Sequence, residues 1–286
     1  MRRRNHIFIF GLGYVGQHLA RALSQRGWQI TGTTRDPDTL AGQVPASWTI
    51  LPFIAGQRLD GLASHLRQVT HLISGISAVS GSDPVLDLHE AEIAAFDGWT
   101  GYLSATSVYP DQPAGWVDED TPPAPVTTRG KARLTAEQRW QHTAQAELFR
   151  LAGIYGPGRN VLADLRAGTA RIIDKPDQVF NRIHQTDISR IIMAAMAAPR
   201  PNRIINLCDN LPANQGDVVR YAAQLIKVSP PAPVPLEAAG LSAMALSFYA
   251  AQRRVRSKII KSELGLSLHY PDYKSGLEAL VRSDAP

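Results

Sequence analysis

The sequence has a single cysteine, Cys208, among its 286 residues. An intrachain disulfide is therefore excluded, and so low a cysteine content is typical of proteins that fold in a reducing compartment. No apolar run approaches the roughly 20 residues that a membrane-spanning helix needs. The three arginines at positions 2–4 precede only a short apolar run, which is needed as a core strand and does not match a secretory signal. We therefore expect a cytoplasmic protein.

The sequence also lacks internal repeats, a Ser-His-Asp arrangement, and the spacing of His, Cys, Asp and Glu that indicates a metal site. Its formal net charge is +5, but the basic residues are dispersed along the chain. This dispersal favours a small anionic partner over nucleic acid or a membrane. The densest basic cluster, at 253–261, is explained equally well by a solvated helix face and by an anion site. The sequence leaves open whether the protein forms a homodimer.

What the sequence does contain is a glycine-rich turn near its start. Residues 7–10 form an apolar run that predicts a buried strand, and Gly11, Gly13 and Gly16 follow it directly. Apolar residues then recur at helical spacing, so the order is strand, glycine turn, helix. This context predicts a dinucleotide site, because the N–H groups and the dipole at the helix start attract phosphate. An ordinary turn between strand and helix is the alternative.

The end of the second predicted strand, 28–34, suggests which dinucleotide is bound. An acidic residue at this place binds the adenosine ribose hydroxyls, whereas a nearby arginine accommodates a 2′-phosphate. The sequence here reads Thr34, Arg35, Asp36. A guanidinium can donate two hydrogen bonds to a phosphate at once, so we expect NADP rather than NAD. In the alternative, Asp36 binds the hydroxyls and Arg35 stacks on the adenine.

Strands and helices alternate up to about residue 155, which predicts an α/β fold with a doubly wound parallel sheet. The strand predicted at 70–75 ends in small residues, among them Ser74, which leave room for a ligand or form a plain turn. Residues 156–286 are less regular, and the last fifty look mainly helical. We therefore expect two domains, 1–155 and 156–286, with 183–208 returning to the sheet of the first.

Several segments, taken together and in order, resemble a known family. They are Gly11 to Gly16, Ser104 to Tyr109, Leu151 to Arg159, Asn181 to His184 with Asp187, and Ser257-Lys258 with Glu263 to Gly265. They resemble the extended short-chain dehydrogenase/reductases, the NAD(P)-dependent epimerase/dehydratase family, and most closely an atypical bacterial subgroup. The resemblance implies a Rossmann domain for the cofactor, a small C-terminal domain over the substrate, and a catalytic set of Ser or Thr, Tyr and Lys.

The three catalytic positions depart from the family's pattern. Arg129 stands at the tyrosine position and Arg133 at the lysine position, while Ala105 replaces the hydroxyl residue. An arginine cannot deliver a proton near neutral pH, although it can stabilise an oxyanion or bind an anion. Thr106 or a neighbouring serine could supply the hydroxyl after a small backbone shift. Tyr109 is the nearest spare phenol, and a structural role is the favoured alternative for it.

The candidates therefore fall into three groups. For catalysis they are Thr106, Tyr109, Arg129 and Arg133. For cofactor contact they are Gly11, Gly13, Tyr14, Val15, Gly16, Thr34, Arg35, Ser74, Ser104, Arg133 and Ile154. For substrate contact they are Ser107, Arg159, Arg182, His184 and Arg256.

The substrate candidates carry alternatives. The resemblance places the three arginines near positions where the family's sugar-nucleotide enzymes bind phosphate, but each is also explained as a surface arginine. His184 is a proton donor or a packed histidine.

Two functions follow. The first is an NADP-dependent oxidoreductase or epimerase-like enzyme with a rearranged acid/base set, acting on a small anionic substrate, with a nucleotide-linked one as a variant. The second is a non-catalytic NADP-binding redox sensor or scaffold.

Overall fold

The computed structural model describes residues 5–78, 81–113, 115–175 and 177–283, so the arginines at positions 2–4 lie outside the described residues. The strands are β1 (His6–Phe10), β2 (Gln29–Thr34), β3 (Thr49–Pro52), β4 (His71–Ser74), β5 (Trp99–Ala105), β6 (Trp116–Val117), β7 (Glu147–Leu151), β8 (Gly153–Tyr155), β9 (Ile172–Asp174), β10 (Arg182–His184), β11 (Ile204–Leu207), β12 (Pro233–Pro235) and β13 (Arg254–Val255).

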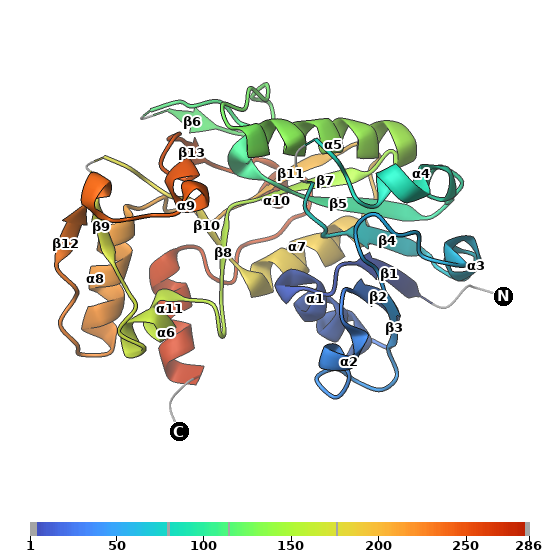
Figure 1. Ribbon diagram of the computed structural model, residues 1–286, viewed down its shortest axis with the longest axis horizontal. Coiled ribbons are helices and arrows are strands. Elements are labelled where there is room, and N and C mark those ends of the chain that lie inside the picture. The colour runs from blue at the N-terminus through green and yellow to red at the C-terminus, as the bar shows by residue number, and fades with distance from the viewer. Residues whose placement is uncertain (1–4, 79–80, 114, 176, 284–286) are drawn as a thin grey trace. The chain divides into compact units, whose positions relative to one another are not determined.

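The helices are α1 (Tyr14–Ser24), α2 (Pro37–Leu40), α3 (Leu62–Leu66), α4 (Leu86–Ala94), α5 (Thr128–Ala144), α6 (Val161–Arg166), α7 (Gln185–Ala197), α8 (Gln215–Leu225), α9 (Ala243–Ser247), α10 (Ile259–Ser262) and α11 (Tyr273–Ser283). Two short 3-10 turns are η1 (Thr106–Val108) and η2 (Leu236–Ala238). Figure 1 shows these elements along the chain. Within the described ranges, no helix combines the length and the apolar character that crossing a bilayer would need.

A seven-stranded parallel sheet with the strand order β11-β7-β5-β4-β1-β2-β3 forms the centre of the fold (Figure 1). β1 pairs in parallel with β2 on one side and with β4 on the other. The strand order thus reverses between β1 and β4, and such a reversal creates a crevice beyond the carboxyl ends of the strands. The doubly wound α/β sheet expected from the sequence is confirmed.

The apolar run of β1 lies at the centre of the sheet's core. Its residues 7–10 are buried, and the Phe10 ring packs against Phe53 at 5.6 Å between centroids. α1 covers the sheet with Val15, Leu19 and Leu23, which recur at helical spacing and are buried. Burial of each such side chain stabilises the fold by roughly 1.5–3 kcal/mol, so this packing holds the glycine turn between β1 and α1 in place.

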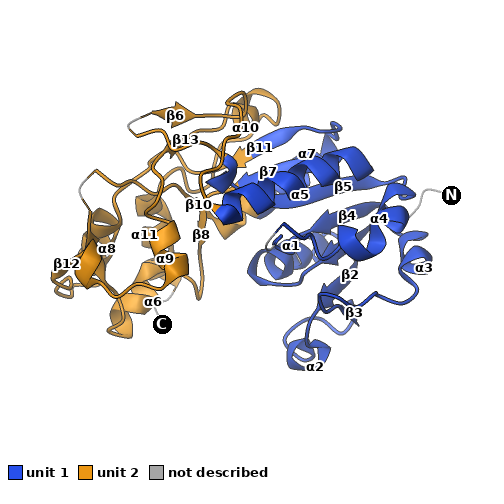
Figure 2. Ribbon diagram, turned by 45° about the horizontal axis from the view of Figure 1, so that its top comes forward, with its two compact units in different colours: residues 1–108, 128–150, 189–205 blue, residues 109–127, 151–188, 206–286 orange. Residues whose placement is uncertain are grey.

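The chain divides into two compact units, coloured separately in Figure 2. Unit 1 comprises residues 1–108, 128–150 and 189–205, and unit 2 comprises residues 109–127, 151–188 and 206–286. Each unit is therefore built from three segments of the chain. The expected domains, 1–155 and 156–286, divide the chain once, and the segment 189–205 in unit 1 falls within the stretch 183–208 that we expected to return to the sheet.

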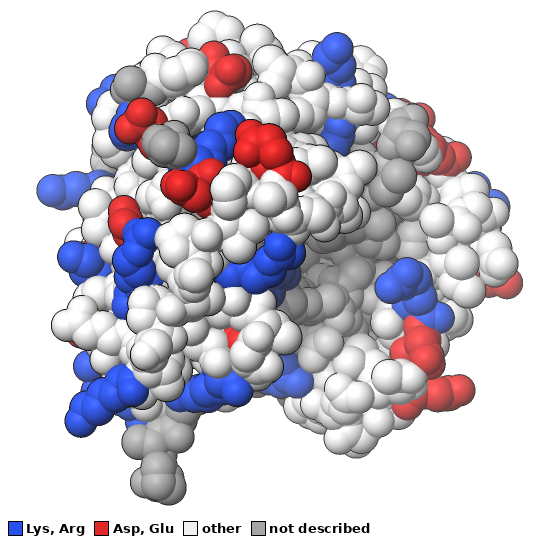
Figure 3. Space-filling view, turned by 60° about the vertical axis from the view of Figure 1, so that its left-hand side comes forward, with Lys and Arg blue, Asp and Glu red and all other residues white. Residues whose placement is uncertain are grey.

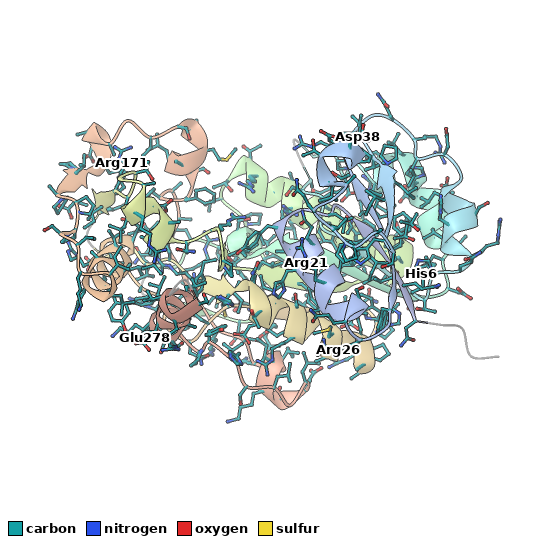
Figure 4. The ribbon with its side chains drawn as sticks, turned by 90° about the horizontal axis from the view of Figure 1, so that it is seen from below. His6, Arg21, Arg26, Asp38, Arg171 and Glu278 are labelled. Atoms are coloured by element: carbon teal, nitrogen blue, oxygen red, sulfur yellow. The ribbon has the colours of Figure 1, made fainter. Side chains whose placement is uncertain are left out.

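Unit 2 has a small core of its own. The core contains Tyr155, Leu162, Val218 and Leu277, contributed by β8, α6, α8 and α11. The pairs β8–β10, β9–β12 and β6–β13 form three two-stranded parallel sheets. The Tyr221 hydroxyl on α8 donates a hydrogen bond of 2.6 Å to Glu278 on α11, whose position is labelled in Figure 4. The glycine-rich segment after β7 begins with a short strand of its own, β8.

Candidate functional site

The glycine turn joins β1 to α1 in a geometry that requires glycine. Gly11 has a φ of +90°, which side-chain-bearing residues rarely adopt. A Cβ on Gly16 would lie 2.4 Å from the carbonyl oxygen of Gly11, so the helix approaches the turn too closely for any side chain. The Gly11 N–H donates to the hydroxyl of Thr33 at 3.0 Å, which ties the turn to β2.

The start of α1 has the features of a phosphate site. Gly13 is its N-cap, no side chain caps the helix, and the first turn carries no acidic residue. A Cβ placed on Gly13 would meet nothing within 4 Å, so the space beside the backbone is open. Tyr14 is half-buried and Val15 is buried against the core. An anion can approach the helix start here, where the dipole attracts negative charge.

The end of β2 distinguishes the two residues that compete for the adenosine ribose. The Asp36 carboxylate caps α2, accepting from the Thr39 N–H at 3.0 Å and from the Thr39 hydroxyl at 2.5 Å. These hydrogen bonds lower the pKa of Asp36. Arg35 is exposed, and among the described residues its side chain has no hydrogen-bond or ion-pair partner. Thr34 is half-buried and its hydroxyl accepts from the Asp36 N–H at 3.4 Å.

The loop after α2 is held against α1. Arg21, labelled in Figure 4, donates to the carbonyl of Gln43 at 3.1 Å and to the side chain of Gln17 at 3.3 Å. The segment that carries Arg35 is thereby attached to the helix whose start would hold the phosphates. The two predicted parts of the cofactor site, the glycine turn and the end of β2, belong to one connected region of unit 1.

The hydroxyls at the ends of β4 and β5 have different surroundings. Ser74 is fully buried at the end of β4, and its Oγ has no hydrogen-bond partner among the described residues. Ser104 is buried in β5 and donates to Glu137 at 2.5 Å, while Glu137 forms a buried ion pair with Arg150 at 2.7 Å. The Ser104 hydroxyl is therefore engaged in the core of unit 1 rather than open to a ligand.

The positions of the family's catalytic set lie at the end of β5 and the start of α5. β5 ends at Ala105, and Thr106 and Ser107 follow in the turn η1, both half-buried. Arg129 is exposed in the first turn of α5, and α5 packs against η1. Two hydroxyls and one guanidinium are thus presented by neighbouring elements of unit 1.

Arg133, at the lysine position, points into the protein. Its side chain is buried, and it donates to the Tyr102 hydroxyl at 3.1 Å, the Leu103 carbonyl at 2.9 Å and the Ser77 hydroxyl at 2.6 Å. Burial raises the pKa of Tyr102 to about 12, so this phenol stays protonated. Sequence analysis missed Ser77; its place directly after the small-residue end of β4 was the signal that could have indicated it.

Tyr109 belongs to unit 2 and is fully buried. Its hydroxyl donates to the side-chain oxygen of Asn206 at 2.8 Å. The Asn206 N–H in turn donates to Glu119 at 3.0 Å, and its side chain donates to the carbonyl of Arg256. This arrangement ties the segments 109–127 and 206–286 of unit 2 together and favours the structural role over the catalytic one for Tyr109.

His184 is also packed inside unit 2. Its ring contacts Tyr155 edge-on at 5.1 Å and Tyr270 at 4.2 Å between centroids. Its Nδ1 accepts from the Thr186 N–H at 3.2 Å. The packed interpretation is favoured over a proton donor. Ile154, on the neighbouring strand β8, is half-buried.

The three arginines expected to bind substrate differ in their environments. Arg182 donates to the carbonyls of Phe180 at 2.9 Å and Ala213 at 3.1 Å, and desolvation lowers its pKa. Arg256 is exposed and forms an ion pair of 2.9 Å with Asp118. Arg159 is exposed beyond β8. Figure 3 shows Lys and Arg in several separate groups on the visible face, with Asp and Glu beside some of them, so the basic charge is dispersed.

One titratable residue of unit 2 was not anticipated. Asp209 is 2% exposed, and burial raises its pKa to about 7. One carboxylate oxygen accepts from the Leu211 N–H at 3.2 Å, and the other has no hydrogen-bond partner among the described residues. Its place directly after the largely apolar segment 204–208 was the sequence signal for a buried acid.

The chain is similar to a functionally unknown conserved protein from Silicibacter pomeroyi DSS whose structure has been solved. It is 44% identical, covers 98% of this chain and 99% of its own, and has a TM-score of 0.90. Protein YeeZ from Escherichia coli strain K12 is 28% identical over 256 residues, which are 79% of this chain and 85% of YeeZ. No family model matches the sequence.

A structure from Methylobacillus flagellatus indicates which family this chain resembles. Its description places it among the NAD-dependent epimerases/dehydratases; it is 26% identical, 98% of each chain is covered, and the TM-score is 0.75. Over nearly its whole length the chain is thus similar to the NAD(P)-dependent epimerase/dehydratase family of extended short-chain dehydrogenase/reductases. The resemblance inferred from the sequence motifs is confirmed.

Proposed function

We propose that the protein binds NADP through the glycine turn and the end of β2. The observation that carries the proposal is that Asp36 and Arg35, which are adjacent in sequence, differ in their hydrogen-bond partners. The Asp36 carboxylate is used to cap α2, whereas the Arg35 guanidinium is exposed and has no partner among the described residues. A guanidinium in this position suits a 2′-phosphate, and a carboxylate already accepting two hydrogen bonds is poorly placed to accept ribose hydroxyls.

The rest of unit 1 fits the same ligand. The open backbone at Gly13 and the uncapped start of α1 suit a pyrophosphate. Structures with the same fold hold either dinucleotide: MoeE5 was solved with NAD, and a human epimerase family protein with NADPH. They are 18% and 14% identical to this chain, so they support a nicotinamide dinucleotide, and the choice of NADP rests on this chain's own residues.

As an activity we propose reduction, oxidation or epimerisation of a small anionic substrate. A bound nicotinamide supplies or accepts a hydride, and this step needs chiefly the positioning of the reactants. Thr106 and Ser107 offer hydroxyl hydrogen bonds to a substrate oxygen. Arg129 offers a positive charge to an anionic group or an oxyanion. A proton would come from water, because Tyr109 and His184 are packed inside unit 2.

A second function, a non-catalytic NADP-binding sensor or scaffold, is favoured by one specific observation. Tyr109 and His184, which could transfer a proton in the first hypothesis, and Arg133, at the lysine position, are all buried and hydrogen-bonded to protein groups. Such a protein would bind the cofactor as tightly as an enzyme does and would turn over nothing.

The test of NADP binding is a calorimetric titration with NADP and NAD. We expect the wild-type protein to bind NADP at least tenfold more tightly, because the 2′-phosphate gains charge-assisted hydrogen bonds. Arg35→Ala should weaken NADP binding about tenfold or more and leave NAD binding unchanged. Arg26→Ala is the matched control, because Arg26 is exposed near the end of α1. Equal affinity for the two dinucleotides, or an unaffected Arg35→Ala variant, would overturn the proposal.

A turnover screen separates the two functions. The protein is incubated with NADPH and a panel of sugar nucleotides and small carbonyl compounds, and cofactor oxidation or product formation is followed. For the enzyme we expect turnover that Arg129→Ala abolishes and that Lys131→Ala, the exposed neighbouring cation, retains. NADP binding without turnover of any compound supports the sensor or scaffold.

A further inference from the structure

Arg133 is a buried cation without a carboxylate partner. It is 5% exposed, and its acceptors, the Tyr102 hydroxyl, the Leu103 carbonyl and the Ser77 hydroxyl, are all neutral. Glu137, one turn further along α5, is paired with Arg150 instead. Among the described residues, no ion pair involves Arg133, and its buried Nε has no acceptor. Since an unpaired buried charge is costly, this part of unit 1 is short of one negative charge.

Ser77 connects this charge with the surface. It is exposed, and its oxygen accepts from Nη2 of Arg133 at 2.6 Å, a short, charge-assisted hydrogen bond. A serine hydroxyl has one proton, so the O–H of Ser77 remains available to donate. In the part of the chain that the structure describes, that O–H has no acceptor. Ser77 therefore presents a hydrogen-bond donor polarised by the guanidinium behind it.

The position of this donor is set by the glycine turn. The Gly75 N–H donates to the carbonyl of Phe10 at 2.8 Å, and the Ile76 side chain lies 3.1 Å from a Cβ placed on Gly11. The segment 75–77 thus lies beside the turn, on the β4 side of the strand-order reversal. In doubly wound folds the two halves of the sheet each receive one mononucleotide of a dinucleotide. The β4–β5 half would receive the nicotinamide mononucleotide.

We propose that the Ser77 hydroxyl donates a hydrogen bond to the nicotinamide-side phosphate of the dinucleotide, with Arg133 as the positioning residue behind it. The phosphate supplies the negative charge that Arg133 lacks. The inference rests on the proposed NADP binding and deepens it. Arg133 takes over the charge of the family's lysine but acts through Ser77, because its own donors are held by Tyr102, Leu103 and Ser77. A planar guanidinium can serve three acceptors at once, which a lysine ammonium on this helix could do only with a different geometry.

The test uses three ligands that divide NADP into parts: 2′,5′-ADP, 2′-phospho-ADP-ribose and NADP itself. Only the last two contain the nicotinamide-side phosphate. By calorimetry, Ser77→Ala should weaken both about tenfold and leave 2′,5′-ADP unchanged, because it removes one charge-assisted hydrogen bond. Ser77→Thr keeps the hydroxyl and should restore most of the affinity. Ser64→Ala is the matched control, since Ser64 is an exposed serine that accepts from Arg67 at 2.8 Å in α3.

The role of Arg133 is tested by Arg133→Met alone and combined with Ser77→Ala. If Arg133 acts through Ser77, the double variant binds NADP no more weakly than the weaker single variant. Additive losses, or equal losses for all three ligands, would overturn the inference. If Arg133→Met fails to fold, the Ser77→Ala ligand series decides alone. A wild-type protein that binds none of the three ligands contradicts the proposed function itself, whereas normal binding with an unaffected Ser77→Ala variant contradicts only this inference.

Discussion

At the end of β2 a carboxylate and a guanidinium stand next to each other, and only the carboxylate is engaged. Asp36 caps α2, and Arg35 remains available to a ligand. Composition and spacing left both residues as candidates for the adenosine ribose. The helix cap favours Arg35 as the residue that contacts the ribose phosphate, because the Asp36 carboxylate would lose its hydrogen bonds from Thr39 on turning toward a ribose. The capping role of Asp36 thus supports Arg35, and with it NADP, over Asp36 and NAD.

Asp209 yields a prediction at the same scale. Its pKa is raised from 3.8 to about 7, so between these values the folded state binds a proton that the unfolded state has released. Stability therefore falls as pH rises from 4 to 7. Asp209→Asn should remove this cost: the variant should gain on the order of 2–4 kcal/mol in unfolding free energy relative to wild type between pH 4 and pH 8. Urea unfolding at these pH values measures the difference.

Asp174→Asn is the control for that measurement, because Asp174 is exposed on β9. Its unfolding free energy should follow the wild-type pH dependence. An Asp209→Asn variant that also follows it would show that Asp209 is ionised in the folded protein at pH 5–6.

At the scale of elements, the glycine turn assigns different tasks to its glycines. Gly16→Ala would place a Cβ 2.4 Å from the backbone oxygen of Gly11, so helix and turn must separate. We expect a loss of roughly 1–3 kcal/mol in unfolding free energy and the loss of NADP binding. Gly13→Ala meets nothing within 4 Å and lies at a φ of −79°. It should retain stability and lose about tenfold or more in NADP affinity.

Thermal or urea unfolding of the two variants measures the effect on packing, and calorimetry measures the effect on NADP binding. A Gly16→Ala variant as stable as wild type would contradict the packing role, and a Gly13→Ala variant with full NADP affinity would place the pyrophosphate elsewhere.

The long elements were predictable from local pattern, whereas the short ones were not. The apolar run 7–10 predicted β1, because a buried parallel strand favours a continuous apolar sequence, and the segment 28–34 predicted β2; both predictions agree with the structure to within about two residues. The two-residue strands β6 and β13 pair only with each other, and β9 pairs with the proline-rich β12. These strand pairs form because the tertiary structure brings distant segments together, and so no local sequence pattern predicts them.

For the molecule as a whole, the chain runs back and forth between two compact units. Segments 128–150 and 189–205 join unit 1, while 109–127 joins unit 2 although it precedes most of that unit in sequence. The buried link from Tyr109 to Asn206 is one consequence, since it joins residues almost a hundred positions apart within unit 2. A single boundary along the sequence cannot describe this arrangement.

The sequence by itself determined the doubly wound sheet, the place of the glycine turn and the family resemblance, because periodicity, glycine spacing and ordered motifs are local properties. The resemblance also predicts that Arg129 and Arg133 depart from the family's catalytic set. Only the tertiary structure decided which candidate groups are free. Ser104 is engaged by Glu137 and Tyr109 by Asn206, while Ser77 is exposed in front of Arg133. Burial and hydrogen-bond partners arise from residues distant in sequence, so they follow from packing alone.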